Sequence, residues 1–112
     1  MFNIAVVEDN DQDAKTIINS LTRYASKNQL EFRITRHPDA LKLINKYKSN
    51  YDLIFMDIEM PHMSGMEAAK AIRRIDHGVT LVFVSNMAQY AVEGYAVEAF
   101  DYILKPVNDY AL

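Results

Sequence analysis

The chain has 112 residues, of which half are hydrophobic and 24% are charged, and its formal net charge is −3 at pH 7. These values are typical of a single globular domain, and the absence of a basic cluster argues against non-specific binding of nucleic acid. Cysteine is absent, which excludes disulfides and thiolate chemistry. We find no signal peptide and no apolar stretch of the roughly 18 residues that a membrane span needs, so we expect a cytoplasmic protein that does not bind membranes.

Strand-like and helix-like stretches alternate from the N-terminus onward. The apolar run at residues 3–7 predicts a first strand. Hydrophobic residues at helical spacing over residues 13–25 predict a helix, with Asn10 or Asp11 as its N-cap. Hydrophobic and polar residues then alternate at residues 31–35, which is typical of a strand near the edge of a sheet.

The middle of the chain repeats this alternation. Pro38 and Asp39 suit the first turn of a second helix. The apolar stripe of that helix is expected to consist of Ala40, Leu41, Ile44 and Tyr47. Residues 53–56 form an apolar run that predicts a strand buried on both faces, although periodicity alone also allows a buried helical segment. A third helix is expected over residues 66–75, ended by Gly78.

The last part of the chain supplies two more predicted strands. Residues 79–84 are apolar and rich in β-branched side chains, which predicts a fourth strand. Residues 89–96 suggest a short, weak helix that Gly94 interrupts, and residues 102–104 suggest a fifth strand. Five strands that alternate with four helices favour a doubly wound α/β fold with a parallel sheet and right-handed crossovers.

The end of the sequence leaves little room for a fifth helix. Only residues 107–112 follow the fifth strand and its Lys-Pro pair, too few for a full helix. A doubly wound sheet needs helices on both faces, so we expect an under-covered apolar face. We therefore interpret the chain as a truncated piece of a longer protein, and expect that two copies associate or exchange an element to cover that face.

Polar residues follow four of the five predicted strands. In chain order they are Glu8 with Asp9, Asp57, Ser85 and Lys105. Parallel strands bring their carboxyl ends to one edge of the sheet, where ligands bind at the point at which strand order reverses. An isolated Asp at this position would more often be a turn residue, so the interpretation depends on the whole set.

These residue types together suit the chemistry of phosphoryl transfer. Clustered carboxylates repel one another and provide the oxygen ligands that Mg²⁺ prefers. A lysine offers a positive charge to phosphate oxygens, and a serine hydroxyl donates a hydrogen bond to one of them. A carboxylate can also act as the nucleophile and form an aspartyl phosphate.

At these residues the chain resembles the receiver domain of two-component response regulators. The resemblance rests on Glu8-Asp9, on Asp57 followed by Met60-Pro61 and Gly65, on Ser85, and on Lys105-Pro106. It extends over residues 3–106. Residues 83–85, 90–92 and 99–106 are most similar to receivers attached to LytTR-type DNA-binding domains. The resemblance implies a flavodoxin-like fold with strand order 2-1-3-4-5, the order that such receivers illustrate.

The resemblance also implies a phosphorylation site and a metal site. Asp57 would accept a phosphoryl group from a histidine kinase. Asp9 would bind Mg²⁺ directly, together with Asp57, and Glu8 would bind it through a water molecule. The backbone carbonyl of Glu59 would be a further metal ligand. Many receivers have Asp at the position of Glu8, but this substitution keeps the charge, so metal binding is still expected.

The remaining implied roles concern the response to phosphorylation. Ser85 would bind the phosphoryl group, and Lys105 would bridge to it. Tyr102 resembles an aromatic residue that turns inward on activation, although packing in the core explains it equally well. Asn86 is larger than the residue common at its position, which leaves the lifetime of the phosphorylated state open. Family members often have a cis peptide bond before the residue equivalent to Pro106.

Two other functions fit part of the pattern. A pseudo-receiver would use the same fold only to bind a partner protein, but the complete set of acids with Ser85 and Lys105 argues against it. A phosphohydrolase would use Asp57 as the nucleophile and Glu59 as the acid or base, but no further catalytic motif is present.

The histidines are scattered along the chain and have no paired metal ligands. We expect all of them in solvent or at helix caps: His37, His62 and His77.

Overall fold

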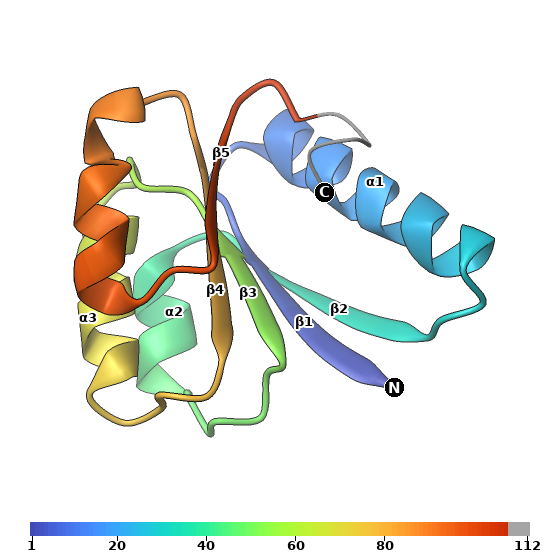
Figure 1. Ribbon diagram of the computed structural model, residues 1–112, viewed down its shortest axis with the longest axis horizontal. Coiled ribbons are helices and arrows are strands. Elements are labelled where there is room, and N and C mark those ends of the chain that lie inside the picture. The colour runs from blue at the N-terminus through green and yellow to red at the C-terminus, as the bar shows by residue number, and fades with distance from the viewer. Residues whose placement is uncertain (108–112) are drawn as a thin grey trace.

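A computed structural model of the chain describes residues 1–107. Its strands form one parallel sheet in the order β2-β1-β3-β4-β5, which confirms the predicted flavodoxin-like topology (Figure 1). The strands are β1 (Phe2–Val7), β2 (Phe32–His37), β3 (Leu53–Met56), β4 (Thr80–Ser85) and β5 (Asp101–Leu104). The helices are α1 (Asp11–Lys27), α2 (Ala40–Asn45), α3 (Gly65–Arg73) and the 3₁₀ helices η1 (Ala88–Tyr90) and η2 (Val92–Val97).

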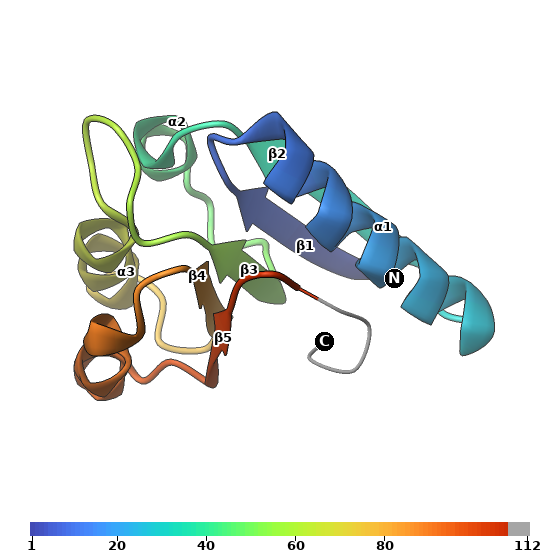
Figure 2. The same ribbon diagram turned by 90° about the horizontal axis from the view of Figure 1, so that it is seen from above.

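The sheet separates two hydrophobic cores, because successive side chains of a strand point to opposite faces. Ala5 and Val7 of β1 belong to the core beneath α2 and α3, whereas Ile4 and Val6 belong to the core beneath α1. Figure 2 shows α1 on one face of the sheet and α2 and α3 on the other. Each fully buried Val or Ile side chain in these cores stabilises the fold by about 1.5–3 kcal/mol.

Side-chain caps fix where each α-helix begins. Asn10 accepts a hydrogen bond from the backbone N–H of Asp13 (2.9 Å) and is the N-cap of α1. Asp39 caps α2. Ser64 and Glu67 form a reciprocal capping box at the start of α3. These caps hold the connections that leave β1 and β3 in defined positions.

The second helix differs from its predicted stripe. The helix ends at Asn45, before Tyr47, and Leu43 is buried whereas Leu41 is 37% exposed. Because Asp39 is the cap, the helix begins at Ala40, and positions three and four residues later face the sheet. Leu41 was therefore wrongly assigned to the buried stripe, and Leu43 takes that place.

Other local predictions also need correction. Ile75 lies beyond the end of α3 and is 62% exposed. The weak helix expected near Gly94 consists of two 3₁₀ segments, η1 and η2.

His37 is half-buried, and its Nε2 lies 2.9 Å from the hydroxyl of Tyr51. The solvent or capping role expected for His37 is therefore wrong. Burial lowers its pKa, and the nearby Asp39 opposes this effect.

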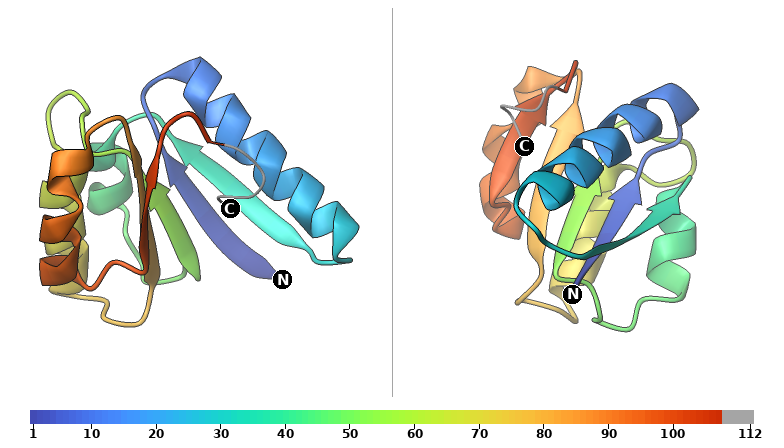
Figure 3. Two further views of the ribbon diagram at one scale, coloured as in Figure 1. Left: turned by 45° about the horizontal axis from the view of Figure 1, so that its top comes forward. Right: turned by 90° about the vertical axis from the view of Figure 1, so that its right-hand side faces the viewer.

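The face that carries α1 is only partly covered by this helix. Within residues 1–107, α1 contacts β1 and β2 (Figure 3). A groove of about 410 Å³ lies beside it, and its lining includes Phe32, Phe55, Phe100 and Ile103. The truncated final helix that the sequence suggested falls on residues 108–112, outside the described part of the chain. In the described part, no helix is both long and apolar enough to cross a membrane.

Candidate functional site

The carboxyl ends of the central strands meet at a small, open, polar pocket of about 200 Å³. The register of the sheet places Val7 beside Met56, so Glu8 and Asp57 leave neighbouring strands at the same level. The pocket is lined by Glu8, Asp9, Asn10, Asp13, Asp57, Glu59, Ser85, Asn86 and Lys105. The structure therefore brings together all the residues that the sequence predicted for the metal and phosphorylation sites.

Asp57 is held rigidly at the end of β3. Its backbone N–H donates to the carbonyl of Val7 (3.1 Å), and its carboxylate accepts from the N–H of Ile58 (2.7 Å). The side chain is buried except for its opening to the pocket. Gly65 supports this position, because a Cβ there would lie only 1.8 Å from the carbonyl oxygen of Asp57.

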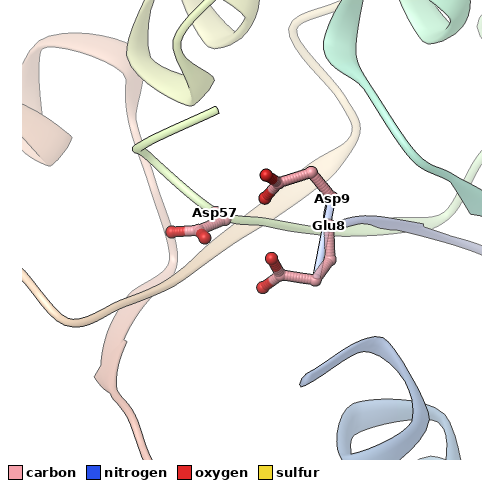
Figure 4. A group of neighbouring side chains, drawn as sticks. All are labelled: Glu8, Asp9 and Asp57. Carbon is pink, nitrogen blue, oxygen red and sulfur yellow. The ribbon is translucent and has the colours of Figure 1, made fainter. Parts of the chain in front are cut away.

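Three carboxylates form a cluster that suits a divalent cation. One oxygen from each of Glu8, Asp9 and Asp57 lies within 4.8 Å of the others. Figure 4 shows the two residues of the β1–α1 loop directing their carboxylates toward the side on which Asp57 lies. Glu8 is almost fully buried, so its carboxylate is removed from bulk water. The cluster fits Mg²⁺, which binds few carboxylates directly and retains several water molecules.

Lys105 supplies positive charge to this acidic pocket. Its Nζ lies 2.7 Å from Glu8 Oε1, 2.7 Å from Asp13 Oδ2 and 3.1 Å from Asp57 Oδ2. Burial by itself lowers the pKa of Lys105, but the three carboxylates outweigh it and raise the pKa above its ordinary value. Lys105 is therefore a permanent cation beside Asp57. The peptide bond between Lys105 and Pro106 is cis, as is frequent in the family that the sequence resembles.

Comparisons with known proteins agree with this arrangement of residues. The sequence matches the family described as response regulator receiver domain over residues 4–112. The chain belongs to this family. The transcriptional regulatory protein YpdB of Escherichia coli (strain K12) is 38% identical over 71 residues, which are 63% of this chain and 28% of YpdB. The sensory transduction protein LytT of Bacillus anthracis is 27% identical over 111 residues, 97% of this chain and 43% of LytT.

Both proteins are LytTR-type regulators, which confirms the resemblance inferred from the sequence. This receiver thus spans less than half the length of these curated relatives. Among solved structures, the response regulator TrrA of Thermotoga maritima, in complex with Mg²⁺ and BeF, has a TM-score of 0.74. It is 28% identical, and the match covers 96% of this chain and 90% of that one.

The burial of Glu8 in the receiver changes its proton affinity. Burial raises the pKa of Glu8 to about 7, although hydrogen bonding with Lys105 and the N–H of Asn10 lowers it. The negative charge of Asp57 adds to the increase. Glu8 therefore exchanges a proton near neutral pH when no divalent cation is bound in the pocket.

Ser85 and Tyr102 act on one short backbone segment next to the pocket. Ser85 is fully buried, and its Oγ accepts from the N–H of Met87 (3.1 Å). Tyr102 donates its hydroxyl hydrogen to the carbonyl of Met87. Its ring lies 6.0 Å from that of Phe83, and its side chain does not line the acidic pocket. The predicted switch residue is therefore connected to Ser85 through the backbone of Met87.

Two residues at the site were not singled out from the sequence. Asp13, in the first turn of α1, pairs with Lys105, which is 92 positions away in the sequence. Arg36, on β2, donates to the carbonyls of Glu8 (2.8 Å) and Asp9 (3.3 Å), and so holds the loop that carries both acids. Asp13 was missed because an acid in the first turn of a helix is commonly explained by the helix dipole alone. Arg36 was missed because the sequence pattern around it is that of an ordinary edge strand.

Proposed function

We propose that this receiver accepts a phosphoryl group on Asp57 from a histidine kinase, with Mg²⁺ as cofactor, and that phosphorylation changes the surface near β4 and β5. The observation that carries the proposal is the position of Asp57. Its carboxylate is buried, opens to a polar pocket, and lies 3.1 Å from the ammonium of Lys105 beside two further carboxylates. A buried Asp with only a structural role has no need of this polar, charged pocket.

The chemistry follows from these neighbours. A carboxylate oxygen of Asp57 attacks the phosphorus of the donor, a new O–P bond forms, and the donor's bond to phosphorus breaks with its electron pair leaving on the donor. Lys105 stabilises the negative charge on the transferred phosphoryl group. The Ser85 hydroxyl, which lines the same pocket, donates a hydrogen bond to one phosphoryl oxygen.

The metal ligands are residues of the same pocket. Asp9 and Asp57 would bind the cation directly, Glu8 would bind it through a water molecule, and the backbone carbonyl of Glu59 would be a further ligand. When bound, Mg²⁺ neutralises the clustered carboxylates and the phosphoryl oxygens. The clustering of the three carboxylates supports this assignment, because one lysine ammonium cannot balance three negative charges held within 4.8 Å of one another.

The conformational response passes from Ser85 to Tyr102. A rotation of the Ser85 side chain toward a phosphoryl oxygen moves its Oγ away from the N–H of Met87. Tyr102, which is bonded to the carbonyl of Met87, then adjusts with this segment. The output in a longer protein is a DNA-binding domain of the LytTR type, a proposal that the name of the transcriptional regulatory protein YpdB supports.

Phosphorylation of the isolated chain tests the proposal. Incubation with acetyl phosphate and Mg²⁺ should add one phosphoryl group to the intact mass, whereas chelation of the metal or Asp57→Asn should prevent the addition. A folded wild-type protein that gains no mass would contradict the proposal and favour the pseudo-receiver. Repeated release of inorganic phosphate from a generic phosphomonoester would instead favour a phosphohydrolase.

A further inference from the structure

Asp13 makes a contact that the proposed metal and phosphoryl chemistry does not use. Its Oδ2 lies 2.7 Å from Lys105 Nζ, closer than the 3.1 Å that separates the same nitrogen from Asp57. Asp13 belongs to α1 and Lys105 follows β5, so the pair connects two elements across the pocket. The backbone of Asp13 is fixed because its N–H is capped by Asn10. The carboxylate is therefore presented to Lys105 from a rigid helical turn.

Asp13 differs from the other two partners of Lys105. Glu8 and Asp57 belong to the cluster of three carboxylates that fits a divalent cation, and Asp13 does not. Once a cation shares the charge of that cluster, the attraction of Glu8 and Asp57 for Lys105 becomes weaker. The attraction of Asp13 is unchanged, since it is not a metal ligand. Asp13 then becomes the strongest partner of Lys105 in the unphosphorylated state.

We propose that Asp13 is a positioning residue that retains Lys105 in the unphosphorylated receiver and competes with the phosphoryl group for its ammonium. This inference rests on the proposed function, because the competition arises only if Asp57 is phosphorylated. A phosphoryl group must draw Lys105 from a carboxylate at 2.7 Å that faces the same pocket. Asp13 therefore slows acceptance of the phosphoryl group. It also keeps Lys105 inside the pocket before the donor arrives.

The same helical turn provides a matched control. Asp11 carries the same charge near the N-terminus of α1, but it pairs with Arg36 at 2.6 Å instead of with Lys105. Its side chain is 87% exposed. Asp11→Asn removes one negative charge and one favourable interaction with the helix dipole, as Asp13→Asn does. A difference between these two variants therefore reports the contact with Lys105.

Phosphorylation kinetics provide the first test. Acetyl phosphate is titrated at saturating Mg²⁺, and the rate of mass gain gives a maximal rate and a half-saturating concentration. Asp13→Asn should raise the maximal rate by about fivefold, the effect of losing one partly exposed ion pair, with little change in half-saturation. Asp11→Asn should behave like the wild type, and Asp13→Glu, which keeps the carboxylate, should return the rate toward the wild-type value.

A second test needs neither metal nor phosphoryl donor. In metal-free buffer, Asp13→Asn should lower the midpoint of thermal unfolding by about 2–5 °C when Lys105 is present, and by less in a Lys105→Met background. Asp11→Asn should have the same effect in both backgrounds. The difference isolates the pair from the general contribution of an acid at the start of a helix.

The outcomes separate this inference from the proposed function. If the wild type is phosphorylated but Asp13→Asn matches Asp11→Asn or reacts more slowly than the wild type, the retaining role of Asp13 is wrong and the proposed function stands. If the wild type is not phosphorylated at all, the proposed function fails and the inference fails with it. Equal effects of Asp13→Asn in the two Lys105 backgrounds would also overturn the inference.

Discussion

At the scale of single residues, burial and charge act in opposition at the edge of the sheet. Glu8 is 1% exposed, and its pKa is raised to about 7 because burial outweighs the favourable interaction with Lys105. The charged form of this buried carboxylate is less stable than the charged form of a carboxylate in water. The receiver maintains it beside Asp9 and Asp57, which is understandable if a divalent cation is bound there in the working protein.

The raised pKa predicts how stability depends on pH without metal. Between the ordinary value of 4.5 and the folded value of about 7, the folded state holds a proton that the unfolded chain has lost. The free energy of unfolding therefore falls as pH rises through this window, by up to about 1.4 kcal/mol per pH unit. Denaturant titrations with a chelator measure the free energy of unfolding at each pH. Between pH 5 and pH 8, this free energy should fall by about 1–3 kcal/mol less in Glu8→Gln than in the wild type. Identical losses would contradict the role of Glu8.

Substitution of Arg36 should change the affinity for Mg²⁺, and the direction of the change shows whether Arg36 acts by its hydrogen bonds or by its charge. Its guanidinium holds the backbone carbonyls of Glu8 and Asp9, so Arg36→Lys, which keeps the charge but loses the fork, should weaken Mg²⁺ binding by about tenfold. Arg36→Gln should weaken it as well. If Arg36 acted only by its charge, the Gln variant would bind Mg²⁺ more tightly and the Lys variant would be unchanged. Calorimetric titration with Mg²⁺ measures the difference.

At the scale of elements, the connection between β3 and α3 joins the fold to the site. The N–H of Gly65 donates to the carbonyl of Ile58 (2.8 Å), and the missing side chain allows the start of α3 to approach the backbone of Asp57. Ser64 and Glu67 close this turn with a capping box. The position of Asp57 thus depends on a residue that has no side chain.

Substitution of Gly65 tests this connection. Gly65→Ala would place a Cβ 1.8 Å from the carbonyl oxygen of Asp57, so the loop must move, and we expect a loss of about 2–4 kcal/mol in the free energy of unfolding. Gly78→Ala is the control, since its Cβ would meet Asp76 at an ordinary 3.7 Å. Chemical denaturation measures both variants. Equal stabilities would show that the turn accommodates a methyl group easily.

The same elements show what sequence patterns can and cannot predict. The strands and the convergence of Glu8, Asp57 and Lys105 were predictable, because apolar runs end at these residues and parallel strands align their carboxyl ends. The pairing of Asp13 with Lys105 was not, since it depends on how α1 lies over the sheet. The 3₁₀ geometry of η1 and η2 was also missed, because η1 has only three residues and Gly94 interrupts η2, so neither has a helical periodicity to measure.

At the scale of the whole molecule, the two faces of the sheet differ. The core beneath α2 and α3 is the larger one, whereas the face beside α1 retains an apolar groove among the described residues. Phe100 lines this groove and is 79% exposed. Exposed apolar surface of this kind favours association, and the homodimer expected from the sequence remains a prediction.

Light scattering across a range of concentrations checks this prediction for the chain of 112 residues. We expect the average mass to rise toward that of a dimer as concentration increases, and Phe100→Lys to suppress the rise. Ile75→Lys serves as the control, because Ile75 is a 62% exposed hydrophobic residue that does not line the groove. A constant monomer mass would exclude association through this face.

The central claim is that Asp57 is the residue that forms the covalent bond to phosphorus. After reaction with acetyl phosphate and Mg²⁺, borohydride reduction converts an aspartyl phosphate to homoserine, which peptide mass spectrometry locates. The account predicts homoserine at position 57 and at no other acidic residue, with none in protein treated without the donor. Homoserine at Asp9 or Asp13, or a phosphoryl group retained on Ser85 with position 57 unchanged, would contradict it.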